Sequence, residues 1–117
     1  MLRNPVDFLR DIEESCSRII EYTRDLSQDE VFRDSMRIDG VLHNLHVIGE
    51  AVKKLPRELR EENPDIPWSE IAGMRDVIAH AYFALDLDIL WQGIQTDVPT
   101  LLSRVRQIIH SNTDTSE

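Results

Sequence analysis

The chain has 117 residues, a formal net charge of −9 at pH 7 and 41% hydrophobic residues. This length fits one small domain whose core needs neither disulfides nor metal. The acidity argues against a general nucleic-acid coat protein, because sequence-independent binding depends mostly on lysine and arginine at phosphates. Any contact with RNA must therefore be local.

The single cysteine and the hydropathy pattern bear on the compartment. Cys16 has no partner for an internal disulfide, so we expect a reducing compartment and a packing role for this residue. No apolar run approaches the roughly 18 to 20 residues that a membrane span needs, and the opening MLRNP does not begin a signal peptide. The sequence thus predicts a soluble, cytoplasmic protein without membrane contact.

Helical periodicity runs along the chain, with no sustained alternation of period two. Asn4-Pro5 is typical of a helix start and predicts a first helix from about Pro5 to Asp25. Ser27 and Glu30 have the spacing of a capping box, which predicts a short helical turn after it. One face of the first helix is apolar and carries Leu9, Ile12, Cys16, Ile19 and Leu26, and the short turn carries Val31 and Phe32.

A second long helix is predicted from about Ser35 to Leu55. Its apolar stripe consists of Ile38, Leu42, Leu45, Ile48, Val52 and Leu55. At about 100° per residue, Asp39, His43, His46 and Glu50 share a sector turned away from that stripe. Such a row of side chains is compatible with a solvated surface, a transition-metal site or a face turned to another chain.

Cations follow closely on this helix, at Lys53, Lys54, Arg57 and Arg60. They are candidates for a local contact with RNA phosphates. Lys53 and Lys54 also fit a solvated helix end, where cations favour the negative end of the helix dipole. Three prolines, Pro56, Pro64 and Pro67, punctuate the connection to the next helix, with one polar helical turn over 57–62.

A short helix is predicted from about Trp68 to Ala79, and a last helix is capped by Asp86. The apolar positions of the last helix keep helical spacing past Pro99, which predicts one long helix kinked at that proline. These positions are Leu87, Leu90, Ile94, Val98, Leu101, Val105 and Ile108. We expect Trp68, Trp91 and Phe83 to serve packing, a single domain over 1–110, and a disordered polar tail over 111–117.

The short helix predicted over about Trp68 to Ala79 carries Arg75, the first residue of the run Arg75-Asp76-Val77-Ile78-Ala79-His80-Ala81-Tyr82, which brings a guanidinium, an imidazole and a phenol together. Arginine offers a planar donor fork for phosphate oxygens, and histidine can move a proton near neutral pH. In one straight helix, His80 would lie about 140° around the axis from Arg75. Either the helix ends near Ala79, or a second protomer completes the site.

This R-x4-H-x-Y string and its surroundings resemble the HEPN superfamily and, within it, the HepT-like toxins. The likeness includes Ile48-Gly49-Glu50-Ala51, the approach Pro67-Trp68-Ser69-Glu70-Ile71-Ala72-Gly73-Met74-Arg75, the run Asp86-Leu87-Asp88-Ile89-Leu90-Trp91 and Asp97-Val98-Pro99. It covers the chain from about Val6 to Ile109.

The fold that we predict is an all-α, antiparallel up-and-down bundle of four main helices plus short connecting helices. The resemblance implies a homodimer whose two motifs face each other across a cleft. It also places Asp39 and Glu50 at the subunit interface beside the motif. We therefore rank the interface first for the polar row, a solvated surface second and a metal site last, and we predict no metal and no cofactor.

The resemblance implies a metal-independent ribonuclease toxin of a type VII-like HEPN/MNT toxin–antitoxin pair, acting on cellular RNA and, by family analogy, on tRNA. Arg75 and His80 would be catalytic. An MNT-type nucleotidyltransferase antitoxin would transfer AMP to Tyr82 and so neutralise the toxin.

Each of these roles has an alternative. His80 also fits a histidine hydrogen-bonded at a helix end, and Tyr82 a residue packed beneath the motif. The whole chain also fits a non-catalytic helical binding module that docks on a nucleotidyltransferase partner, and its acidity suits a protein partner better than RNA.

Overall fold

Helices account for nearly all of the chain that the structure describes. The computed structural model describes residues 4–73 and 87–114, and no strand occurs in these ranges. In chain order the elements are α1 (Pro5–Thr23), α2 (Gln28–Arg33), α3 (Ser35–Lys53), α4 (Arg57–Glu62), α6 (Leu87–Gln92), the π-helical segment η2 (Gly93–Asp97) and α7 (Val98–Asp114). Residues 68–73 are also helical. The all-α prediction is confirmed, whereas the count of four main helices and the homodimer stay predictions.

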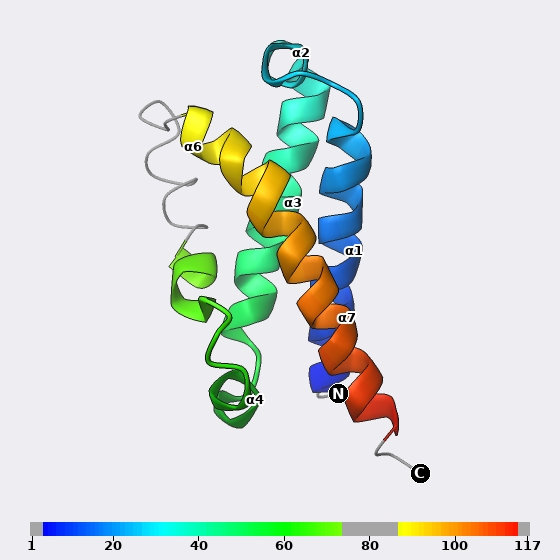
Figure 1. Cartoon of the computed structure of the whole chain (residues 1–117), viewed down its shortest axis with the longest axis vertical. Coiled ribbons are helices and arrows are strands. Elements are labelled where there is room, and N and C mark those ends of the chain that lie inside the picture. The colour runs from blue at the N-terminus through cyan, green and yellow to red at the C-terminus, as the bar shows by residue number, and fades with distance from the viewer. Residues whose placement is uncertain (1–3, 74–86, 115–117) are drawn as a thin grey trace.

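The long helix α1 lies against both α3 and α7, and these two helices run in the opposite direction to α1 (Figure 1). The short helix α2 lies at one end of α3 and α4 at the other (Figure 1). Within the ranges described, no helix is long and apolar enough to cross a membrane.

The predicted helix starts are confirmed in detail. The Asn4 side chain accepts the Val6 N–H at 2.9 Å, Asp7 accepts the Asn4 N–H at 3.2 Å, and Pro5 occupies the first turn. Ser27 and Glu30 form the predicted capping box, with bonds of 3.1 and 2.9 Å. Side-chain oxygens thus satisfy amide groups that the first turn of a helix leaves without partners.

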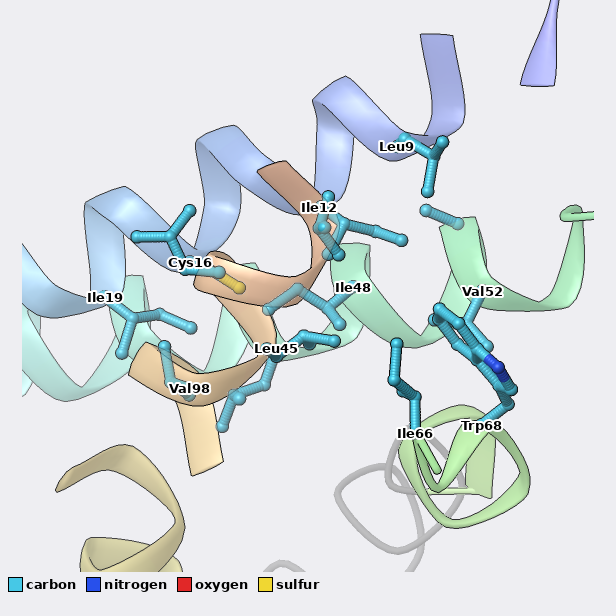
Figure 2. Packing of buried hydrophobic residues seen from close by; sticks show 14 of the residues in the cluster. Leu9, Ile12, Cys16, Ile19, Leu45, Ile48, Val52, Ile66, Trp68 and Val98 are labelled. Atoms are coloured by element: carbon cyan, nitrogen blue, oxygen red, sulfur yellow. The ribbon is translucent and has the colours of Figure 1, made fainter. Parts of the chain in front are cut away.

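The core lies where α1, α3 and α7 meet. Figure 2 shows side chains of α1 meeting those of α3, with Val98 of α7 and the connector residues Ile66 and Trp68 closing the cluster. The α1 residues are Leu9, Ile12, Cys16 and Ile19, and the labelled α3 residues are Leu45, Ile48 and Val52. The packing role predicted for Cys16 is confirmed: it is 0% exposed, and burial raises the pKa of its thiol to about 12.

Gly40 allows the close approach of α1 and α3. A Cβ atom at Gly40 would lie 3.1 Å from Cε2 of Tyr22, which is tighter than an ordinary carbon–carbon contact. A side chain at this position would therefore require the Tyr22 ring to shift by a few tenths of an ångström.

The last helix differs from its prediction. The predicted continuity past Pro99 is confirmed, because the helical run is unbroken from Leu87 to Asp114, but a π-helical turn over Gly93–Asp97 interrupts the α-helix before the proline. Leu87, predicted on the buried stripe, is 47% exposed, whereas Ile94, Val98 and Leu101 are buried as predicted. At the other end α7 continues to Asp114, into the segment predicted to be a disordered tail.

Candidate active site

The residues predicted to be catalytic lie outside the described residues. Arg75, His80 and Tyr82 all fall in 74–86, as do Phe83 and Asp86. The structure instead shows the two flanks between which the motif segment runs. These are the helical residues 68–73 on one side and α6 on the other.

The first flank is firmly attached to the core. Trp68 is buried, and its Nε1–H donates to the backbone carbonyl of Asn63 at 3.0 Å. From α7, Arg104 Nη2 donates to Oδ1 of Asp65 at 2.9 Å. Packing, a hydrogen bond and an ion pair therefore fix the stretch that leads into the motif.

The second flank is held by α2. The Gln28 side-chain amide donates to Oδ1 of Asp88 at 2.7 Å. Phe32 and Trp91 meet edge to face, with ring centroids 5.9 Å apart. Such an aromatic pair contributes roughly 0.5–1.5 kcal/mol beyond its buried area. The beginning of α6 is thus fixed by residues some 60 positions away in the chain.

A groove of about 630 Å³ lies between these flanks. Its floor is apolar and includes Leu45, Ile48, Ile94 and Leu101. Asp65, Glu70, Asp97 and Arg104 add polar groups to its wall, and Ile89 of α6, 68% exposed, lines it as well.

The predicted polar row is present on α3. Asp39 and His43 are exposed, whereas His46 and Glu50 are half-buried beside a hollow of about 150 Å³ that also touches Lys54. At 1.5 Å rise per residue, Asp39 and Glu50 lie about 16 Å apart along the helix. A single phosphate therefore cannot contact the two residues at the same time.

No group of three or more His, Cys, Asp or Glu side chains placed to hold a metal occurs in residues 4–73 and 87–114. The metal interpretation of the polar row therefore gains no support. The placement of Asp39 and Glu50 at a subunit interface stays a prediction.

The four candidate cations beyond α3 differ in their surroundings. Lys53 and Lys54 are exposed, and Lys54 Nζ lies 6.0 Å from the ring centroid of Phe8. Arg57 Nε donates to Oε1 of Glu61 at 3.0 Å. Arg57 is thus paired with a neighbouring carboxylate, whereas Lys53 is an exposed charge in the last turn of α3.

Comparison with known proteins identifies the family. Residues 12–108 match the family model "Ribonuclease HepT-like", and this range includes the whole R-x4-H-x-Y string. The chain belongs to the HepT-like family. None of the solved structures matches this HepT-like chain at a significant level.

Named relatives support the same assignment. A "Putative RNase" of Caldanaerobacter subterraneus subsp. tengcongensis is 36% identical over 108 residues, which are 92% of this chain and 96% of the relative. A "Probable ribonuclease HepT" of Thermococcus cleftensis is also 36% identical over 108 residues, 92% of this chain and 98% of the relative. A Methanocaldococcus jannaschii protein named "Gamma-glutamylcyclotransferase and putative RNase" is 39% identical over 102 residues, but the match spans only 46% of that protein.

Sequence reasoning missed the residues that fix the two flanks. Asp65 and Arg104 are 39 positions apart, and Gln28 and Asp88 are 60 apart. Neither pair has a local spacing signal. The π-helical turn did leave a signal, because Gly93 and Pro99 are both unfavourable inside an α-helix.

Proposed function

We propose that this HepT-like chain is a metal-independent endoribonuclease in which Arg75 and His80 act at the scissile phosphate. The observation that carries the proposal is the family match over residues 12–108, which contains the motif in full. Relatives covered almost end to end by this chain bear ribonuclease names.

The chemistry needs a proton carrier and a cation. Attack by the ribose 2′-hydroxyl forms a new P–O2′ bond, breaks the P–O5′ bond and leaves a 2′,3′-cyclic phosphate and a 5′-hydroxyl. His80 removes the 2′-hydroxyl proton as general base or protonates the leaving O5′ as general acid. Arg75 donates to the phosphate oxygens, where negative charge develops in the transition state. DNA lacks the nucleophile and should be inert.

A homodimer belongs to the same proposal. Arg75 and His80 diverge by about 140° in a straight helix, so a second protomer that faces the first is one way to bring both groups to one phosphate. Light scattering should then give twice the chain mass of 13.6 kDa. A monomer that cleaves RNA would contradict the shared site.

We also propose that a nucleotidyltransferase antitoxin controls the enzyme through Tyr82. The phenolic oxygen attacks the α-phosphorus of ATP, its proton is lost, and pyrophosphate leaves. The AMP phosphodiester on Tyr82 then competes with substrate phosphate for the Arg75 guanidinium. Mass spectrometry after incubation with the antitoxin and ATP should show AMP on the parent and none on Tyr82→Phe. AMP on another residue would contradict this assignment.

The decisive experiment is RNA cleavage by purified protein, with Arg75→Ala and His80→Ala as the active-site variants. Arg18→Ala and His110→Ala remove the same residue types from exposed positions and serve as matched controls. We expect loss of cleavage in the first two variants only, unchanged circular dichroism in all four, and no effect of EDTA. Cleavage retained in either motif variant, with the fold intact, would exclude the mechanism.

The same experiment addresses the alternative of a non-catalytic module that docks on a nucleotidyltransferase. The net charge of −9 favours that alternative, because an acidic surface repels RNA. If the parent protein cleaves no RNA but binds the transferase, the docking module replaces the enzyme.

A further inference from the structure

No further inference is drawn: the strongest candidate, the apolar groove of about 630 Å³ between the helical residues 68–73 and α6, carries none, because the residues that the structure describes do not show what covers it.

Discussion

Replacement of Trp68 tests whether the flank that leads into the motif is anchored by packing. The side chain is 6% exposed, belongs to the main core cluster and donates from Nε1 to the Asn63 carbonyl at 3.0 Å. Trp68→Ala leaves a large cavity, and such a change costs about 3–5 kcal/mol. A domain of this size has a total stability of about 5–15 kcal/mol, so the loss is a large share.

Trp68→Phe separates the hydrogen bond from the packing. Phenylalanine keeps much of the apolar volume but cannot donate to the Asn63 carbonyl, which still accepts the Ile66 N–H at 3.2 Å. We expect a cost of about 1–2 kcal/mol, most of it from the lost bond and the smaller ring. Trp91→Ala, at a half-buried position on α6, is the comparison variant and should cost less than Trp68→Ala, about 1–3 kcal/mol including the lost pair with Phe32.

The assay is urea unfolding followed by far-UV circular dichroism, with the slope of the free energy against denaturant compared among variants. The free energy of unfolding should rise from Trp68→Ala through Trp68→Phe to the parent protein, while the slope stays constant. A cost below about 1 kcal/mol for Trp68→Ala would refute the claim that this residue fixes the connector to the core.

Two further predictions concern titrating groups. Cys16 is buried, and its pKa is raised to about 12. A thiol reagent at neutral pH should therefore leave Cys16 unmodified in the folded protein and label it fully in urea. Rapid labelling of the folded protein would contradict the burial. Hydrogen bonds from Ser27 lower the pKa of Glu30, so this carboxylate stabilises the fold above the unfolded pKa and the stabilisation is lost as pH falls through the folded pKa. The Ser27 backbone N–H is the main donor to this carboxylate, and Glu30→Gln removes the charge that it binds. The stability difference between the parent and Glu30→Gln should therefore shrink on acidification, and a difference independent of pH would exclude a contribution from the Glu30 charge.

The parts of the fold that local rules determine were predictable from sequence. The capping box at Ser27 and Glu30, the helix start at Asn4-Pro5 and the buried face of Leu9, Ile12 and Ile19 all depend on neighbours within four residues. Such signals lie within one helical turn, so a single sequence contains them in full.

The attachment of the two flanks could not be predicted in the same way. The Gln28–Asp88 and Asp65–Arg104 bonds depend on how separate helices pack, and a polar side chain gives no local sign of its distant partner. The predicted stripe through Leu87 assumed one uninterrupted helical period packed on the core, whereas a π-helical turn interrupts the helix and no residue of α6 is buried. Arg75, His80 and Tyr82 lie outside the described residues, so their roles still rest on the motif and the family.

The ion pairs of the described helices bear on how an acidic protein can act on RNA. Arg37, Arg57, Arg104 and Arg106 each pair with a carboxylate, Asp34, Glu61, Asp65 and Glu13 respectively. Exposed pairs of this kind stabilise the fold little, but they leave fewer cations for RNA phosphates. Binding should then rest on a few contacts around Arg75 and Lys53.

For single-stranded RNA each phosphate contact contributes about −0.7 to the slope of log affinity against log salt, so two or three contacts predict a slope no steeper than about −2. A salt titration of RNA binding by the His80→Ala protein, which we expect to be cleavage-deficient, measures this slope. A value near about −5 would require a broad basic surface, which is incompatible with a net charge of −9 and these paired arginines.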